Sequence, residues 1–189
     1  SSQEFETFTS KFLALYPSIH ALSWNPKVSR DERGQFEATI RQQGFKEFQI
    51  LDRVAQGEMA KAGLRDEYFP IGYIYPYEKN KGAHGFDVYG PDPLAPGIRK
   101  ALLDRAKAEN KSFSTGKISI VQAENSFGLL VYHPVFEASG SANSSLLGYT
   151  AGVFIVPSMM EPVRDRAKLA NTHILLFDIT DGEKEFLYD

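Results

Sequence analysis

Apolar side chains recur every three or four residues in three stretches of the chain, which is the spacing of one face of an amphipathic helix, and cap residues mark a fourth helix. In the first stretch the apolar positions are Phe5, Phe8, Phe12, Leu15 and Tyr16, and Pro17 ends the pattern. Such a stripe usually faces a core, and a seam between two copies of the chain is the alternative. The four predicted helices cover residues 3–16, 29–43, 96–110 and 158–170.

Two of these helices carry further signals. Ser29 and Gly44 suit the N-terminal and C-terminal caps of the second helix. On the third helix, the apolar spacing predicts a buried face made of Ile98, Ala101, Leu102 and Ala106.

Alternating apolar residues and clusters of β-branched and aromatic residues predict strands elsewhere. The predicted strands cover residues 19–24, 46–51, 68–77, 112–115, 118–121, 129–136, 147–156, 172–179 and 185–188. Residues 56–67 and 78–85 are polar or charged and contain glycine, so they are predicted as loops. Helices and strands do not alternate regularly, which argues against a doubly wound parallel sheet. The predicted fold class is α+β, with antiparallel sheets and helices on one side.

Composition narrows the class of protein. The chain has 189 residues, of which 42% are hydrophobic and 13% aromatic, so it folds as one globular domain or as two small ones. Its net charge is only -3 and its Lys and Arg residues form no cluster, so we expect no nucleic-acid partner. The absence of cysteine excludes a disulfide scaffold, a thiolate nucleophile and a cysteine zinc site.

We expect neither a membrane span nor a secretory leader within these 189 residues. No stretch reaches the roughly 18 apolar residues that a spanning helix needs. The longest apolar run, residues 146–156, is interrupted by glycine, tyrosine and threonine. Its abrupt start and end lead us to expect a soluble piece of a longer protein.

Catalytic and metal-binding signals are weak. The four histidines lie far apart in sequence, at His20, His84, His133 and His173, so no helical zinc pair exists. The sequence holds no nucleophile elbow and no glycine-rich phosphate loop. Asp178 and Asp181 flank a predicted turn and fit a solvated hairpin end better than a cation site. We expect no enzyme, no metal and no cofactor. A small hydrolase or isomerase that uses Asp87 and His133 is the catalytic alternative.

Three segments carry a more specific pattern. Residues 24–28 read Trp-Asn-Pro-Lys-Val and are followed by Arg33 and by Phe-Glu at 36–37. Residues 68–76 read Tyr-Phe-Pro-Ile-Gly-Tyr-Ile-Tyr-Pro, followed by Asn80 and by Gly-Phe-Asp at 85–87. The third segment joins Pro-Val-Phe at 134–136 to Gly-Tyr-Thr-Ala-Gly-Val-Phe at 148–154.

Taken in this order, the three segments resemble the CHASE family, the sensor domain of plant cytokinin receptors and of many bacterial signalling proteins. The resemblance implies an N-terminal stalk helix followed by two PAS-like subdomains with antiparallel sheets. It places the end of the stalk at residues 1–18 and a strand and helix of the membrane-proximal subdomain at 19–45. The membrane-distal, ligand-binding subdomain then covers 46–156, and the proximal subdomain resumes at 157–189.

The resemblance also implies a ligand site. Its leading residue is Asp87, because the matching aspartate of the plant receptors accepts hydrogen bonds from the adenine of the hormone. The other implied ligand-binding residues are Tyr73, Phe86, Ser114, His133, Gly152 and Phe154. Ser114 stands where plant members have leucine, and a pocket threonine falls near Ala123 or Glu124 here, so a pocket more polar than the plant one is expected.

The function that the resemblance implies is extracytoplasmic sensing. A small molecule, either cytokinin- or adenine-like or another polar compound, binds the distal subdomain. The signal crosses the membrane to a histidine kinase or a cyclic-nucleotide output module through flanking membrane helices of the parent protein. A homodimer is expected. The alternative is a dimerisation or interaction module with a vestigial pocket.

Overall fold

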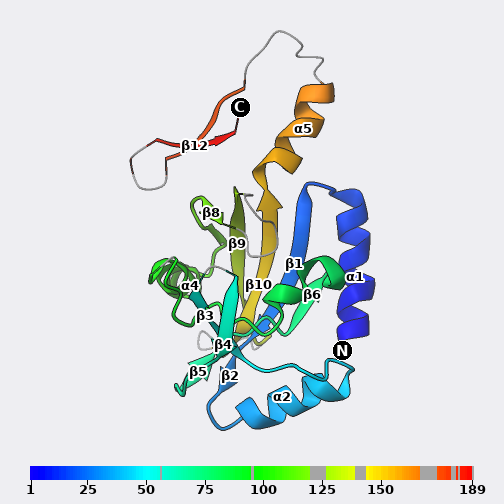
Figure 1. The fold of residues 1–189 in the computed structure, drawn as a ribbon, viewed down its shortest axis with the longest axis vertical. Helices are drawn as coiled ribbons and strands as arrows, with labels where there is room; N and C mark the ends of the chain where they lie inside the picture. The colour runs from blue at the N-terminus through cyan, green and yellow to red at the C-terminus, as the bar shows by residue number, and fades with distance from the viewer. Residues whose placement is uncertain are drawn as a thin grey trace.

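The computed structural model describes residues 1–55, 57–94, 96–119, 127–138, 144–166, 174–179, 182 and 184–188. Its centre is an antiparallel six-stranded sheet with the strand order β6-β1-β10-β9-β7, and β8 also pairs with β9 (Figure 1). The strands are β1 (Ile19–Pro26), β6 (Tyr73–Tyr75), β7 (Phe113–Ser114), β8 (Ile118–Ser119), β9 (Phe127–Phe136) and β10 (Leu146–Ile155).

The two longest strands, β9 and β10, set which side chains enter the core. Successive side chains of a strand point to opposite faces of the sheet. On β10, Ala151 and Val153 therefore face the core, and on β9, Tyr132 does so while His133 is exposed. Ala151 and Tyr132 are register partners, so the two strands present one continuous inner face.

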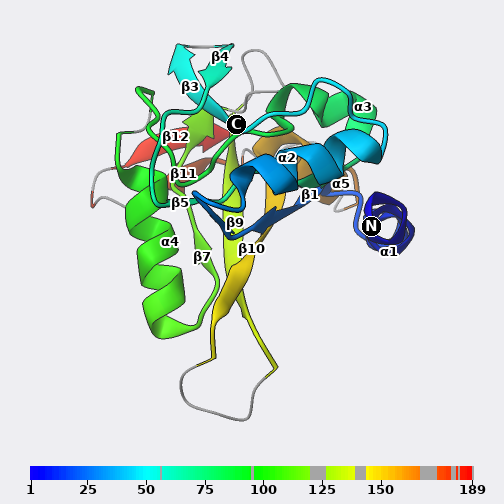
Figure 2. The same ribbon diagram turned by 90° about the horizontal axis from the view of Figure 1, so that it is seen from below.

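Helices flank this sheet on both edges (Figure 2). At the β6 edge lies α1 (Ser2–Leu15), which begins with a capping box between Ser1 and Glu4. At the opposite edge α4 (Ile98–Glu109) packs against β7 and β9. The remaining helical segments are α2 (Arg33–Gln42), α3 (Tyr77–Asn80), the 3-10 turn η1 (Lys81–Ala83) and α5 (Val156–Arg166).

Three short ladders complete the described part. They pair β2 (Val28–Ser29) with β5 (Glu67–Tyr68), β3 (Leu51–Ala55) with β4 (Glu58–Lys61), and β11 (Leu176–Asp178) with β12 (Glu185–Tyr188). A second small core gathers around the first of these ladders and contains Val28, Ile50, Ala62 and Tyr68.

The predicted α+β class with antiparallel sheets is confirmed, as are the helices at α1, α4 and α5 and the strands at β1, β9, β10, β11 and β12. The ends of the last predicted helix and of the strand predicted at 118–121 lie outside the described residues, as do His173 and Asp181.

The prediction was wrong around the second helix. Ser29 is not its cap, because it pairs with Glu67 in the β2–β5 ladder, and α2 starts only at Arg33. Ser29 still makes the reciprocal bonds of a capping box, because its hydroxyl accepts from the Glu32 N–H at 3.3 Å and Glu32 Oε2 accepts from the Ser29 N–H at 3.1 Å. The capping signal therefore forms in the turn before α2, and the helix itself begins four residues later than predicted.

The prediction was also wrong between residues 46 and 85. The strand predicted at 46–51 begins only at Leu51, and the loop predicted at 56–67 contains β4. The strand predicted at 68–77 breaks after Tyr68 and resumes at Tyr73, and between them Pro70 forms only an isolated antiparallel bridge with Asp87. The loop predicted at 78–85 contains most of α3 and η1. These elements are short, so long-range contacts rather than local pattern define them.

The buried face predicted for the helix at 96–110 was only partly correct: Ala106 is buried and Leu102 packs partly buried against the core, but Ile98 and Ala101 are exposed. The other buried residues of α4 are Arg99 and Leu103. A periodicity argument expects a charged side chain to face solvent, but Arg99 turns inward to an ion pair with Asp92.

One predicted boundary can be compared with the sheet. β1, which was assigned to the membrane-proximal subdomain, pairs with β10 on one side and with β6 on the other. It therefore lies at the centre of the sheet that contains the strands assigned to the distal subdomain. The division of the chain into two PAS-like subdomains stays a prediction.

Candidate functional site

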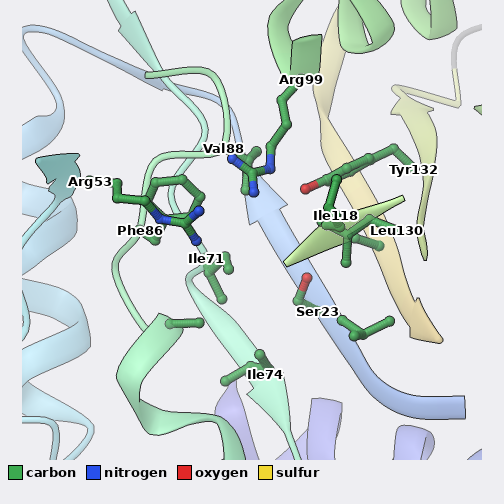
Figure 3. A pocket seen from close by; sticks show the side chains of 13 residues that line it. Ser23, Arg53, Ile71, Ile74, Phe86, Val88, Arg99, Ile118, Leu130 and Tyr132 are labelled. Atoms are coloured by element: carbon green, nitrogen blue, oxygen red, sulfur yellow. The ribbon is translucent and has the colours of Figure 1, made fainter. Parts of the chain in front are cut away.

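A small cavity lies between the inner face of the central sheet, the segment 83–88 and α4 (Figure 3). Its volume is about 40 Å³. Most of its wall is apolar, and the apolar side chains are Ile71, Ile74, Ala83, Phe86, Val88, Ile118, Leu130, Ala151 and Val153. Four residues with polar groups interrupt this wall: Ser23, Arg53, Arg99 and Tyr132.

The wall that carries Phe86 is built by backbone pairing. The Leu51 N–H donates to the Gly85 carbonyl at 2.9 Å, and the Asp87 N–H donates to the Leu51 carbonyl at 2.8 Å. On the other side, the Ile71 N–H donates to the Phe86 carbonyl at 2.9 Å. The extended segment is thus held on both edges, and its side chains alternate in direction.

Gly85 is required where this segment begins. Its φ is +87°, and a Cβ atom there would lie 2.3 Å from the carbonyl oxygen of Gln49. Only glycine adopts this conformation without strain and leaves room for the neighbouring backbone. The start of the cavity wall therefore depends on the absence of a side chain.

Alternation sends Phe86 and Val88 into the cavity and Asp87 to the other side. There Asp87 is fully buried, and its carboxylate accepts four hydrogen bonds. Oδ1 accepts from the backbone N–H groups of Phe69 (2.8 Å) and Tyr89 (3.0 Å). Oδ2 accepts from Arg65 Nε (3.2 Å) and Nη2 (2.7 Å). These partners occupy the acceptor capacity of the carboxylate, which is about four lone pairs.

Asp87 thus belongs to a cluster with Arg65 and Asp52. The Arg65 guanidinium also donates to Asp52, whose Oδ2 lies 3.0 Å from Nη1, and Asp52 accepts a further hydrogen bond from the Gly63 N–H at 3.1 Å. Arg65 keeps 24% of its side chain exposed, so the cluster reaches the surface through that residue. Its two carboxylates raise the pKa of Arg65 above its ordinary value, although burial opposes them.

A second ionic cluster borders the cavity itself. Asp92 Oδ2 accepts from Arg53 Nη1 at 3.2 Å and also from Arg99 Nη1. All three side chains are at most 5% exposed. The Asp92 Oδ1 atom accepts from the Leu94 N–H at 3.0 Å, which fixes the carboxylate. Burial and the nearby Arg99 lower the pKa of Arg53, with Asp92 opposing.

The aromatic ring of Phe86 lies against both cations. The guanidinium carbons of Arg53 and Arg99 are each 5.2 Å from its centroid, which is within cation–π range. Figure 3 shows the Tyr132 hydroxyl directed toward Arg99 and the Ser23 hydroxyl pointing into the cavity. Polar groups from β1, β3, α4 and β9 therefore face an otherwise apolar cavity.

Of the seven sequence-predicted site residues, Phe86 alone lines this cavity. On β10, Gly152 lies between the lining residues Ala151 and Val153, and Phe154 follows Val153; both are on the opposite face of the strand. The family motif identified the strand but not which of its faces borders the cavity.

The other predicted residues have local partners. Tyr73 lies on β6, where its hydroxyl donates to Gln43 Oε1 at 3.3 Å. Ser114 is exposed on β7 and donates to the Thr115 carbonyl at 2.9 Å. His133 is exposed on β9, with its Nδ1 3.1 Å from the Ser112 hydroxyl.

Sequence reasoning missed Arg53 and Arg99 as cavity residues. The available signal was Arg99 at the start of the i, i+4, i+7 series that continues with Leu103 and Ala106. Arg53 gave a similar signal as a charged residue within a strand-like run. A charge on an otherwise apolar face indicates a buried pair, but the partner Asp92 cannot be identified without the fold.

A second, shallower hollow of about 520 Å³ lies near the turn after α2. It is bordered by an aromatic group made of Phe45, Phe48, Tyr77 and His84. His84 Nε2 donates to the Gly72 carbonyl at 2.9 Å. Burial lowers the pKa of His84, although this hydrogen bond opposes the shift.

Within the described residues, no group of three or more His, Asp or Glu side chains is placed to hold a metal ion. None of the helices that the structure describes is long and apolar enough to cross a membrane.

Comparison with known proteins supplies the family. No curated protein sequence matches this chain. The family model of the CHASE domain matches residues 1–188, essentially the whole chain, and not only the three motifs at 24–156. Domains of this family are extracellular sensor domains of receptors. The chain therefore belongs to the CHASE family of sensor domains.

Proposed function

We propose that this CHASE domain senses a small molecule that binds in the cavity beside Phe86, and that binding alters how the two ends of the central sheet are held. The observation that carries the proposal is a buried cavity whose apolar wall is interrupted by converging polar groups. Apolar pockets with a few convergent polar groups are the usual form of a small-molecule site.

The fold offers a route for the signal. Ile19, at the start of β1, pairs with Phe154, near the end of β10. The helix α1 precedes β1 by a short turn, and α5 follows β10 directly. Ala151 and Val153 line the cavity on the same strand that enters α5 (Figure 1). A ligand that favours one position of β10 against β1 would thus favour one arrangement of α1 and α5.

The remaining parts of the proposal rest on the family. The domain would pass its signal through membrane helices of a parent protein to a histidine kinase or a cyclic-nucleotide output module. Residues 46–156 would form the ligand-binding part, and residues 19–45 and 157–189 the part that leads to the membrane. Because β1 pairs with β10, the two parts would share one sheet.

A second possible arrangement of the site has Asp87 accept a hydrogen bond directly from the ligand. It requires a ligand donor to replace Arg65 or a backbone N–H, because those groups occupy the carboxylate. An adenine-like ligand further requires the cavity to widen, since pockets for drug-sized ligands hold about 300–1,000 Å³.

Thermal unfolding tests the proposal. Adenine derivatives, amino acids and small carboxylates are screened against the wild-type chain, Ala151→Leu, which fills the cavity, and Thr150→Leu, which places the same new side chain on the exposed neighbour. A ligand at 100 times its Kd stabilises the folded state by about 2.7 kcal/mol. The midpoint should rise for the wild type and Thr150→Leu but not for Ala151→Leu. The milder Val153→Ile serves if Ala151→Leu does not fold, and a midpoint that no compound raises contradicts the proposal.

The second candidate function is a dimerisation module whose pocket is vestigial. The exposed apolar residues of α1 favour it, because Phe8 is 63% and Leu15 73% exposed. Apolar side chains gathered on an exposed face indicate an interaction surface.

A further inference from the structure

The cavity beside Phe86 carries an excess of buried positive charge. Two guanidinium groups, Arg53 and Arg99, share the single carboxylate of Asp92. Removing a charge from water costs several kcal/mol unless the charge is paired and hydrogen-bonded. Within the part of the chain that the structure describes, one cation of the pair is therefore left without an anion of its own.

The hydrogen bonds of Arg53 and Arg99 also show that these cations lack acceptors for part of their N–H groups among the described residues. Arg53 Nε, Arg53 Nη2 and Arg99 Nε are buried and have no partner among the described residues. A buried donor without an acceptor costs roughly 1–3 kcal/mol, and more when it is charged. Both side chains that carry these donors line the cavity.

The neighbouring acidic residues do not supply the missing acceptor. Asp52 and Asp87 direct their carboxylates to Arg65, on the other side of the strand that carries Arg53. Their hydrogen bonds go to Arg65 and to backbone N–H groups. Tyr132 and Ser23 also face the cavity, but neither carries a charge, and the Ser23 hydroxyl donates to Asn25 Oδ1 at 3.3 Å.

We propose, on the basis of the function proposed above, that the ligand of this cavity is a small organic carboxylate. Its carboxylate accepts hydrogen bonds from the free guanidinium N–H groups of Arg53 and Arg99 beside Phe86. Its apolar part contacts Ile71, Ile74 and Val153. Guanidinium groups bind carboxylates by charge-assisted hydrogen bonds, which are roughly twice as strong as neutral ones.

The volume limits the size of the guest. A cavity of about 40 Å³ lies far below the range of drug-sized sites. A carboxylate with a tail of two or three carbons meets this limit better than a ring system. The aliphatic wall also favours a guest with an apolar part over a bare inorganic anion.

The first experiment uses the wild-type chain and isothermal titration calorimetry. The probes are sodium propionate and sodium butyrate, with propionamide as the neutral isostere and sodium phosphate as the inorganic anion. Sodium chloride keeps the ionic strength equal. Propionate or butyrate should bind at least about tenfold more tightly than propionamide, because hydrogen bonds to charged groups contribute about 1.5–3 kcal/mol. Equal binding of acid and amide, or binding of phosphate alone, would overturn the proposal.

The second experiment removes the cations one at a time. Arg99→Met and Arg53→Met should each weaken carboxylate binding by roughly 10- to 100-fold. Arg105→Met is the matched control on α4, because Arg105 is exposed and pairs with Glu109 on the surface; it should leave the affinity unchanged. Arg53→Lys keeps the charge but loses the planar fork, so it should give an intermediate affinity.

Stability without ligand gives a third readout. Arg99→Met leaves one Arg53–Asp92 pair, whereas Asp92→Asn leaves two cations without a carboxylate. The midpoint of thermal unfolding should therefore fall much further for Asp92→Asn than for Arg99→Met. The opposite order would contradict the charge excess on which the proposal rests. If either methionine variant fails to fold, the comparison of propionate with propionamide decides alone.

The outcomes separate this inference from the proposed function. Binding of neutral or adenine-like compounds that Ala151→Leu abolishes, without binding of carboxylates, would overturn the inference and leave the proposed function standing. A chain that binds none of the probes and none of the screened compounds would overturn both.

Discussion

Phe86 and Asp87 are consecutive residues whose side chains serve opposite sides of one extended segment. Phe86 lies against Arg53 and Arg99 at the cavity, and Asp87 closes the separate cluster around Arg65. The aspartate that the family resemblance selects as ligand anchor thus holds the wall on which the aromatic ring stands. Replacing Asp87 therefore tests whether this residue stabilises the fold or binds the ligand directly.

Asp87→Asn should destabilise the fold strongly. The change leaves Arg65 with one carboxylate and places a neutral amide where Oδ1 accepts two backbone N–H groups. Breaking a buried ion pair costs about 3–5 kcal/mol. Urea unfolding measures the difference. Asp66→Asn is the control, because Asp66 pairs with Arg30 at 93% exposure and surface pairs contribute roughly 0–1 kcal/mol. A variant as stable as the wild type that no longer binds ligand would show that Asp87 is the anchor itself.

Gly85→Ala should weaken the fold by more than the roughly 1–3 kcal/mol of a strained backbone conformation, because a Cβ atom also meets the Gln49 carbonyl. Gly82→Ala is the matched control three residues earlier, since no atom lies within 4 Å of its Cβ position. Chemical unfolding of both variants checks the difference. Equal stability of the two variants would mean that the segment before Phe86 can shift without loss of folding stability.

How much of this site the sequence predicts can be judged from particular residues. The motifs located the segment 85–87 and the strand at 148–154, because both are continuous in sequence. Within β10 they selected Gly152 and Phe154, whereas Ala151 and Val153 face the cavity. A one-residue difference reverses the face of a strand, so a motif without the fold cannot choose between them.

The ion pair around Arg99 shows a different limit. The apolar pattern on α4 identified the buried Ala106 but did not include Arg99, whose charged side chain is also buried. The partner Asp92 precedes Arg99 by 7 residues in the sequence. The second cation, Arg53, precedes Asp92 by 39 residues. Their meeting depends on the packing of α4 against the sheet, which no local pattern encodes.

Lowering the pH should destabilise the fold through His84. Burial among Phe45, Phe48 and Tyr77 lowers its pKa in the folded state below the ordinary 6.5, with the Gly72 carbonyl opposing. A depressed pKa means that the unfolded chain binds the proton more readily. The stabilising contribution is therefore complete above pH 6.5 and is lost as the pH falls toward the folded-state pKa.

Unfolding midpoints between pH 8 and pH 5 test this contribution. The wild type should lose stability over that range, and His84→Gln should lose less. His20 shifts in the same direction, because burial and Lys79 lower its pKa while Asn80 opposes them. The variant is therefore expected to reduce the slope without abolishing it. If the midpoint of His84→Gln changes with pH as steeply as that of the wild type, other groups cause the whole pH dependence.

The exposed face of α1 leads to a prediction about self-association. Phe8 and Phe12 stack with ring centroids 4.9 Å apart, and with Leu15 they form a face that no described part of the chain covers. Thr9 is buried on the other side of the helix, and Phe5 packs near Tyr73. One side of α1 therefore holds the helix to the sheet, and the other is available to a second copy.

The double variant Phe8→Ser/Leu15→Ser should raise the dissociation constant of a dimer at least about tenfold, since burying each such side chain contributes roughly 1.5–3 kcal/mol. Sedimentation velocity over a range of concentrations measures it. Leu64→Ser is the control, because Leu64 is 83% exposed and belongs to a different surface. A wild-type chain that stays monomeric throughout, or a double variant that associates as strongly, would exclude this face as the dimer contact. Because α1 also precedes β1 by a short turn, a dimer formed there would connect the central strands of two copies.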